Sequence, residues 1–326
     1  MKKTALAHAN IALVKYWGKR DAALNLPAVG SISMTLEALS THTSVDFRDD
    51  LPGDMLILNG RPAAVKQEQR VGAFLDLFRR EAGITAAAEV VSENNFPTGA
   101  GLASSASGFA ALALAAGAAA GLPLSPTRLS ELARRGSGSA ARSIYGGFVE
   151  MKAGEQSDGT DAVAVQLQNA AYWPLAMLIL ITSEQEKELG STEGMNRTAQ
   201  TSPYYPAWIA SSVSDLAAMR EAIAGKDFQR LGEIAEFSCF KMHGLALSAD
   251  PAILYWNDLS VTLIHEVRRL RRQGYGAYVT MDAGPQVKVI CLPEDAPKLQ
   301  QQLGQIEGIQ RILPTAIGGD ARLIND

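Results

Sequence analysis

The chain has 326 residues, of which 47% are hydrophobic and 20% are charged, and its formal net charge is −4. These values are typical of a globular protein with one large or two ordinary domains, and they exclude a disordered chain. Because the net charge is mildly negative, the chain has no general attraction for nucleic acid, and an anionic ligand has to be held by a local group of cations.

The cysteine and histidine content limits the chemistry further. Cys239 and Cys291 lie among apolar residues, which favours buried thiols in a reducing compartment, although two cysteines can also pair. The four histidines show no metal-ligand spacing, so no metal site built from protein ligands is expected. The first residues do not resemble a signal peptide, and the Ala-rich run 103–123 is only weakly hydrophobic, so we expect a cytoplasmic protein without a membrane span.

The first predicted element is a strand at residues 5–14, which ends in a group of cations and large aromatic residues at 15–20. A strand end with solvated lysines is the simplest interpretation. Lys15 favours another one, because it stands between an apolar and an aromatic residue. A partly buried lysine needs a carboxylate or a phosphate as its partner.

The following segments alternate strand and helix patterns. Alternating or β-branched runs bounded by Gly, Pro and Asp predict strands, and apolar residues at helical spacing predict an amphipathic helix. The predicted strands are 31–36, 43–47, 55–58 and 87–92, and the predicted helix is 67–81.

A glycine-rich loop at 96–107 precedes an uncharged, Ala-rich helix that extends to residue 120. Gly99 and Gly101 allow a tight turn, and Ser104 or Ser105 can cap the helix. The free N–H groups at such a helix start favour a phosphate. An ordinary capped helix is the alternative, and the Gly-Lys-Ser/Thr ending of a Walker A loop is absent.

A second small-residue loop follows a helix predicted at 127–134. The loop alternates glycine and serine, including Ser137 and Ser139, and arginines that include Arg142 lie on both sides of it. Exposed N–H groups, hydroxyls and a forked guanidinium can bind a second anion. A flexible linker is the alternative, but the loop is short and leads directly into the strands predicted at 145–152 and 162–167.

The second half of the chain begins with a continuous apolar run at 175–182, which is typical of a fully buried strand. We place a domain boundary at its end, which divides the chain into 1–182 and 183–326. The remaining elements are predicted as helices at 208–224, 228–242, 255–273 and 296–303 and as strands at 277–281, 287–292 and 310–313. Helix pairs on an antiparallel sheet favour an α+β fold over a doubly wound parallel one.

Two polar positions in this half are further candidates for chemistry. Asp282 ends a predicted strand before Ala-Gly-Pro, where an aspartate often only forms a turn. Ser191 lies in a Gly-Ser-Thr-Glu segment that would otherwise be an ordinary helix start.

Taken together, these segments resemble the mevalonate diphosphate decarboxylases, a branch of the GHMP kinase superfamily. They occur in the family's order and spacing across nearly the whole chain, and the "KYWGK" and "GSGSA-R" motifs are specific to this branch. The matching segments are "ANIALVKYWGKRD" (9–21), "NLP" (25–27), "NNFPTGAGLASSASGFAAL" (94–112), "RRGSGSAARSIYGGFVE" (134–150), "STEGM" (191–195) and "VTMDAGP" (279–285).

The resemblance implies a two-lobed fold with the active site in the cleft between the lobes. The N-terminal lobe is expected to be βαβ-rich and ribosomal-protein-like, and the C-terminal lobe to be ferredoxin-like. The resemblance also implies a homodimer that uses ATP and Mg²⁺ to phosphorylate the 3-hydroxyl of mevalonate 5-diphosphate. Loss of phosphate and CO₂ then gives isopentenyl diphosphate.

The family's functional positions carry over to residues of this chain. Asp282 matches the catalytic aspartate, which orients or deprotonates the hydroxyl, and Lys15 matches the lysine beside it. Positions that match ATP-binding residues are Asn10, Gly99, Gly101, Ser104 and Ser105. Positions that match substrate-binding residues are Tyr16, Lys19, Ser137, Ser139, Arg142 and Ser191.

The chain also departs from the family pattern near the expected cleft. Val29-Gly30 and Gly190 stand where relatives usually carry polar side chains. A mevalonate 5-phosphate decarboxylase and a mevalonate 3-kinase-like enzyme therefore stay as alternatives. A non-enzymatic ligand sensor on the same fold is a more remote one.

Overall fold

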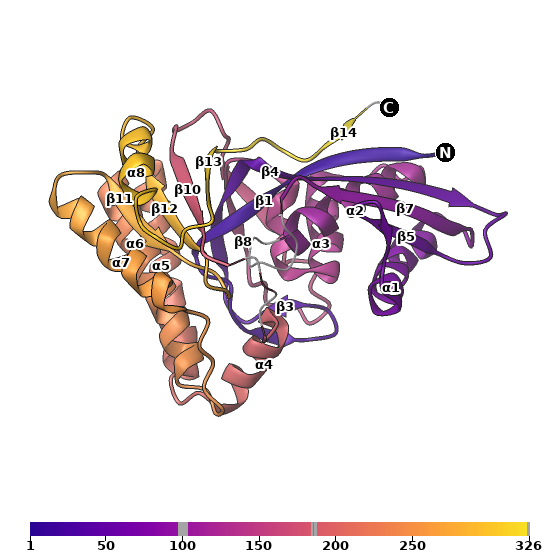
Figure 1. The fold of residues 1–326 in the computed structure, drawn as a ribbon. Coiled ribbons are helices and arrows are strands. Elements are labelled where there is room, and N and C mark those ends of the chain that lie inside the picture. Colours follow the sequence, from indigo (N-terminus) through magenta and orange to yellow (C-terminus); the bar gives the residue numbers. More distant parts are fainter. Residues whose placement is uncertain (97–103, 184, 186–187, 325–326) are drawn as a thin grey trace.

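The computed structural model describes residues 1–96, 104–183, 185 and 188–324, and Figure 1 shows its two lobes. Each lobe is a sheet with helices packed on it, so the predicted α+β class and the two-lobed architecture are confirmed. The loop that holds Gly99 and Gly101 lies outside the described residues. None of the described helices has the length and apolar character that a bilayer crossing requires.

The first lobe is built on an eight-stranded sheet. Its strands are β1 (Lys3–Val14), β4 (Ser31–Arg48), β5 (Met55–Leu58), β6 (Arg61–Pro62), β7 (Ala87–Asn94), β8 (Phe148–Met151), β9 (Ala164–Gln168) and β14 (Arg322–Ile324). The main path has the order β14-β1-β4-β7-β5-β6, and β8 and β9 extend the sheet beside the first part of β4. Only β5 and β7 pair in parallel among these described strands.

The two strands expected at 31–36 and 43–47 are one continuous strand, β4, so the predicted break between them is wrong. β1 pairs along both parts of β4. Between the pairs His8–Ser40 and Asn10–Thr35 the extra residues lie on β4, and between Ala12–Ser33 and Val14–Ile32 the extra residue lies on β1. The first residues of β4 pair with β8 and the last ones with β7. Pairing with these strands, which are distant in the sequence, keeps the backbone extended between residues 36 and 43. Polar and apolar residues do not alternate in that segment, so its sequence alone does not predict a strand.

The α-helices of the first lobe agree with their predicted positions. They are α1 (Val65–Ala82), α2 (Ser104–Ala119) and α3 (Pro126–Gly136), whereas the segment expected as a Gly-Ser loop forms a 3-10 helix, η1 (Gly138–Ile144). The Ala-rich α2 packs on β1 and β4, where residues such as Ala110 and Ala111 are fully buried. The short hairpin of β2 (Lys19–Asp21) and β3 (Leu26–Pro27) was not predicted, because strands of two or three residues leave no periodic signal.

The second lobe has the ferredoxin-like topology that the resemblance implied. Its strands are β10 (Ala176–Ile181), β11 (Ala277–Thr280), β12 (Val287–Cys291) and β13 (Arg311–Ala316), and its helices are α4 (Ser191–Thr201), α5 (Tyr205–Ala224), α6 (Phe228–Leu247), α7 (Asp258–Arg272) and α8 (Ala296–Leu303). The antiparallel sheet has the order β11-β12-β10-β13. Helices connect β10 to β11 and β12 to β13, whereas β11 and β12 follow each other directly, as in a βαββαβ unit. The predicted buried thiols, Cys239 and Cys291, are confirmed as free and buried.

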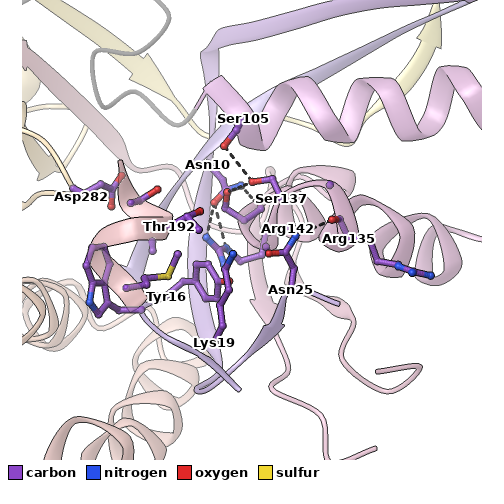
Figure 2. A pocket seen from close by; sticks show the side chains of 18 of the residues that line it. Asn10, Tyr16, Lys19, Asn25, Ser105, Arg135, Ser137, Arg142, Thr192 and Asp282 are labelled. Carbon is purple, nitrogen blue, oxygen red and sulfur yellow. Dashed lines mark hydrogen bonds between the residues drawn. The ribbon is translucent and has the colours of Figure 1, made fainter. Parts of the chain in front are cut away.

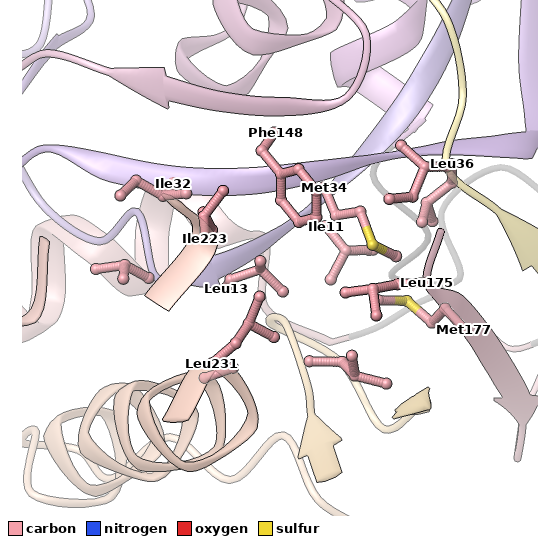
Figure 3. Close-up of a cluster of buried hydrophobic side chains, with 14 of the residues drawn as sticks. Ile11, Leu13, Ile32, Met34, Leu36, Phe148, Leu175, Met177, Ile223 and Leu231 are labelled. Atoms are coloured by element: carbon pink, nitrogen blue, oxygen red, sulfur yellow. The ribbon is translucent and has the colours of Figure 1, made fainter. Parts of the chain in front are cut away.

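One hydrophobic cluster joins the two lobes (Figure 3). It brings together Leu13 of β1, Phe148 of β8, Ile179 of β10 and Leu231 of α6, all of which are fully buried. Helix α6 contacts both β1 of the first sheet and β11 of the second sheet. The relative position of the lobes is therefore fixed by tightly packed apolar side chains rather than by a linker.

We expect Leu231→Ala to lower the free energy of unfolding by about 2–5 kcal/mol, because it removes a fully buried side chain from the cluster between the lobes. Leu247→Ala is the matched control, since Leu247 ends the same helix and is 43% exposed. Urea unfolding measures both. An equal, small effect of the two substitutions would show that Leu231 does not lie in a shared core.

Candidate active site

A cavity of about 730 Å³ gathers the predicted site residues between the two lobes (Figure 2). Its lining comes from the end of β1, from α1, from the first residues of α2 and α4, from the α3–η1 junction and from the turn after β11. The predicted residues that line it are Asn10, Lys15, Tyr16, Lys19, Ser104, Ser105, Ser137, Ser139, Arg142, Ser191 and Asp282. The predicted residues Gly99 and Gly101 lie outside the described part of the chain.

The charge of this lining is opposite to that of the whole protein. Five cations and one carboxylate, Asp282, line the cavity within the described residues, whereas the chain has a net charge of −4. The five cations are Lys15, Lys19, Arg70, Arg135 and Arg142. Such a local excess of positive charge, with many hydroxyls beside it, suits a ligand that carries several negative charges.

Asp282 and Lys15 form an ion pair at the junction of the lobes. Lys15 follows β1 and Asp282 follows β11, and Lys15 Nζ lies 2.7 Å from Asp282 Oδ1. The Lys15 side chain is 1% exposed and that of Asp282 is 26% exposed, so the carboxylate can meet a ligand while the lysine cannot reach solvent. The buried lysine has the carboxylate partner that its apolar sequence neighbours require.

A second lysine, Lys288 of β12, approaches the other carboxylate oxygen, with Nζ 3.7 Å from Asp282 Oδ2. Burial acts to raise the pKa of the Asp282 carboxyl, but the charges of Lys15, Lys288 and Arg142 outweigh it and hold that pKa well below its ordinary range. Asp282 is therefore an anion at neutral pH.

The turn that carries Asp282 is held in place from several sides. Ser260 Oγ donates a hydrogen bond to the carbonyl of Pro285 at 2.7 Å. Gln286, which is fully buried, accepts from the backbone N–H of Thr182 and donates to the carbonyl of Ser183. The turn-forming interpretation of Asp282 does not account for this arrangement, in which the side chain itself is directed at a lysine 267 residues away.

Arg142 is buried beside this pair and is held by polar side chains from other elements. Its Nε and Nη2 donate to Asn10 Oδ1 at 3.2 and 3.0 Å, and its Nη1 donates to Ser31 Oγ at 2.6 Å. Burial lowers the pKa of Arg142 to about 10, so it remains a cation at neutral pH. These bonds use three of the five guanidinium N–H groups, which leaves others for a ligand in the cavity.

The serine residues of the two small-residue loops meet across the cavity. Ser105 Oγ, at the start of α2, lies 3.1 Å from Ser137 Oγ, which in turn lies 3.3 Å from Ser139 Oγ. The loop at 137–139 needs Gly138, because a Cβ there would overlap the Tyr16 hydroxyl. That hydroxyl is buried without a hydrogen-bond partner among the described residues, and burial raises the pKa of Tyr16 to about 12. A neutral, unpaired hydroxyl in a cationic cavity is a donor for an anionic ligand.

Several residues of the site were missed at the sequence level. The sequence does carry a signal for Lys288: it lies within an apolar strand, where burial of a lysine without a partner costs free energy. Arg70 had none: it donates to the carbonyl of Gly136 at 2.7 Å and lies over the ring of Phe109, but in the sequence it resembles any charged helix residue. Other lining residues that were missed are Asn25, Arg135 and Thr192.

Two of the departures from the family pattern, Val29 and Gly30, lie in packed surroundings, whereas a Cβ on Gly190 would meet nothing within 4 Å. Val29 is buried in an apolar cluster with Trp17 and Trp208. A Cβ on Gly30 would lie 2.8 Å from Leu216 Cδ1 of α5, so a side chain at this position would require the Leu216 side chain to move. Neither Val29 nor Gly30 is among the described residues that line the cavity.

Comparisons with known proteins cover both lobes. Two family models match: the diphosphomevalonate decarboxylase-like N-terminal domain at residues 7–164 and the mevalonate 5-diphosphate decarboxylase C-terminal domain at residues 177–320. A diphosphomevalonate decarboxylase of Aspergillus fumigatus is 42% identical over 90% of this chain and 78% of its own length.

Solved structures are similar over the whole chain. The mevalonate diphosphate decarboxylase of Staphylococcus aureus has a TM-score of 0.94 and 40% identity and covers 99% of this chain and 98% of its own. A structure of MDDEF in complex with MVAPP, AMPPCP and magnesium has a TM-score of 0.93 and 43% identity and covers 100% and 99% of the two chains.

The ion pairs of Asp282 predict how stability depends on pH. Its depressed pKa means that the pairs stabilise the fold above the pKa of the unfolded carboxyl, and that this contribution is lost as the pH falls through the lower, folded value. We expect Asp282→Asn to lower Tm by several degrees at pH 7, and the difference from the wild type to narrow below about pH 5. Thermal unfolding from pH 7 to pH 3 measures this, with the exposed Asp49→Asn as the control. A Tm difference that is constant with pH would contradict the pairing.

Proposed function

The chain belongs to the diphosphomevalonate decarboxylase family, and from this premise we propose that it catalyses the ATP-dependent decarboxylation of mevalonate 5-diphosphate to isopentenyl diphosphate, ADP, phosphate and CO₂. The observation that carries the proposal is the anionic Asp282, held by buried Lys15 in a cavity whose other charged lining residues, in the part of the chain that the structure describes, are cations. The substrate and the nucleotide are both polyanions, and the reaction needs one carboxylate close to a hydroxyl.

The described residues fit ATP and its Mg²⁺. We assign the nucleotide phosphates to Ser104 and Ser105 at the N-terminal end of α2, where helix N–H groups and hydroxyls meet the cavity, and to the loop with Gly99 and Gly101. When bound, Mg²⁺ neutralises phosphate charge and is held largely by the phosphate oxygens. Asn10 lines the same cavity. Because its Oδ1 accepts a hydrogen bond from Arg142, we propose that Asn10 orients the Arg142 guanidinium.

We assign the anionic groups of the substrate to a set of lining residues that adjoins the nucleotide side at Ser105 and Ser137. Lys19, Arg142 and the hydroxyl of Tyr16 supply positive charge and donors there. Ser137 and Ser139 add hydroxyls on the Gly-Ser loop, and Ser191 adds one at the start of α4. Forked donation by Arg142 suits a phosphate or a carboxylate.

The chemistry then follows from the position of Asp282. Its carboxylate accepts a hydrogen bond from the 3-hydroxyl and takes up the proton as the hydroxyl oxygen bonds to the γ-phosphorus of ATP and the bond to ADP breaks. A tertiary hydroxyl is a poor leaving group, whereas the phosphate ester leaves with its electron pair. Cleavage of the bond to the carboxylate carbon then releases CO₂, and its electrons form the double bond.

Lys15 supports this step in two ways. Its charge keeps Asp282 ionised before the transfer, and its hydrogen bond fixes Oδ1. Because Lys15 is buried, water does not screen its charge, and its attraction for the developing negative charge is stronger than that of a surface lysine.

Three further assignments belong to the proposal. We place the division between the two catalytic lobes before β10 rather than after residue 182, because β10 hydrogen-bonds in the second sheet. We propose a cytoplasmic location, on the two free thiols. We propose a homodimer, on the family resemblance alone.

The test is to incubate the protein with ATP, Mg²⁺ and each of mevalonate, its 5-phosphate and its 5-diphosphate, and to follow CO₂, ADP and phosphate. Release of all three products with the 5-diphosphate supports the proposal. CO₂ with the 5-phosphate alone would establish the monophosphate decarboxylase instead. ADP without CO₂ would indicate a 3-kinase, and binding without turnover a ligand sensor.

We expect Asp282→Asn to remain folded and to bind its ligands while kcat falls by roughly 10²–10⁴-fold, because the amide cannot accept the hydroxyl proton. Steady-state kinetics on the folded variant measure this, with Asp49→Asn as the control. A kcat close to that of the wild type would return Asp282 to the role of a turn residue.

We expect Arg142→Ala to weaken binding of the phosphorylated substrate by about ten- to a hundredfold and to change ATP binding much less, because a buried, charge-assisted contact is lost. Titration with each ligand separately measures the two affinities. Arg272→Ala, on the exposed side of α7, is the control. Unchanged substrate affinity would remove Arg142 from the substrate site.

A further inference from the structure

We propose that Lys288 is a positioning residue for the reaction, which acts through Asp282 by holding its second carboxylate oxygen and keeping it ready to accept the substrate hydroxyl. This role rests on the function proposed above, and it adds a residue from the centre of the second sheet to the catalytic machinery. Lys288 is not among the described residues that line the cavity, and it reaches the site through Asp282, which does line it.

The position of Lys288 in the sheet explains how it reaches the site. It pairs with Thr280 of β11 on one side and with Ile179 of β10 on the other, so it lies on the central part of the sheet. Alternate residues of β12, such as Val287 and Val289, pack in the cluster with α7 and α8. Lys288 projects from the opposite face, where Ile290 packs in the cluster shared by the two lobes.

Two lysines from different lobes thus meet the two oxygens of one carboxylate. Lys15 Nζ lies 2.7 Å from Oδ1, and Lys288 Nζ lies 3.7 Å from Oδ2. Both lysine side chains are 1% exposed. A carboxylate with a cation at each oxygen resists protonation, because protonation leaves both ammonium groups without their anionic partner. It also resists rotation about its Cβ–Cγ bond, because rotation moves the oxygens away from the cations in a poorly solvated site.

A purely structural role does not account for the choice of residue. Of its neighbours on this face, Ile179 and Ile290 are apolar and Thr280 is polar but uncharged, and an uncharged side chain would fill the space without the cost of burying an ammonium group. The longer separation of Lys288 from Oδ2 also leaves that oxygen more accessible to a ligand hydroxyl than Oδ1, which already accepts a hydrogen bond from Lys15. The geometry therefore assigns Oδ2 to the substrate and Lys288 to its orientation.

The other titratable groups around Asp282 on α6 do not change their charge in the neutral pH range. Burial, with the charge of Lys15, lowers the pKa of His243 on α6 to about 3, and burial raises the pKa of the Cys239 thiol to about 11. Both are neutral between pH 5 and pH 9. Lys15 and Arg142 are the further cations that act on Asp282, from the end of β1 and from η1. Removal of the Lys288 charge should therefore appear as a change in the titration of Asp282.

The experiment compares the wild type with Lys288→Met, which keeps the length of the side chain and removes its charge. Lys298→Met, on the exposed side of α8, is the matched control. We expect kcat at pH 7 to fall about tenfold or more, with the KM for mevalonate 5-diphosphate within about twofold. We expect the acidic limb of the kcat profile to move up by about one pH unit, since an opposite charge at this distance lowers a carboxyl pKa by that order.

A double-mutant cycle tests the route of action. In the Asp282→Asn background, Lys288→Met should cause no further loss of kcat, because the carboxylate through which it acts is gone. Lys288→Arg, which keeps a charge, should retain most of the activity and the wild-type acidic limb. Lys288→Gln replaces Lys288→Met in these measurements if the methionine variant does not fold.

Three results would overturn the role of Lys288. A lower Tm with unchanged kcat and unchanged pH profile would make it a structural ion pair. A change in KM alone would make it a substrate contact, and full additivity with Asp282→Asn would show that it does not act through that carboxylate. In each of these cases the wild type still turns over, whereas an inactive wild type would overturn the proposed function and the role of Lys288 with it.

Discussion

The ion pair between Lys15 and Asp282 is the interaction on which the rest of the site depends. Its partners come from opposite ends of the chain and from different lobes, so the pair exists only when the lobes are packed together. Removal of either partner destabilises this junction, because the buried Lys15 then loses its carboxylate or Asp282 loses its nearest cation. The surroundings supply further cations but no second carboxylate in the described lining, which keeps Asp282 ionised and leaves an excess of positive charge for anionic ligands.

Helix α6 is the scaffold that makes this junction rigid. Ser238 accepts a hydrogen bond from the backbone N–H of Lys15 at 3.0 Å, and the neighbouring Cys239 Sγ accepts one from the backbone N–H of Met281 at 3.1 Å. One turn of helix therefore holds the backbone on both sides of the ion pair, while Leu231 at its other end packs in the core between the lobes. Positioning within a fraction of an ångström, which proton transfer requires, follows from this packing.

The arginines around the Gly-Ser loop divide into structural and ligand-facing groups. Arg134 is fully buried, and its guanidinium donates to the backbone carbonyls of Leu24, Gly159 and Ala162, so its charge is used to hold loops together. Arg142 lines the cavity, and only some of its guanidinium N–H groups donate hydrogen bonds to protein groups. The same residue type thus serves the fold at one position and the site at another, and the difference lies in which acceptors surround it.

The sequence by itself determined the fold class, the helix at 296–303, the buried strand near 175–182 and the residue types of the site, because local periodicity and short motifs carry that information. Only the tertiary structure decided that β4 is one strand, that β10 pairs in the second sheet and that Arg70 and Lys288 belong to the site. Each of these depends on partners far away in the chain. The local sequence indicates whether a residue lies in a helix or a strand. Tertiary packing determines which charged residue and which strand it pairs with.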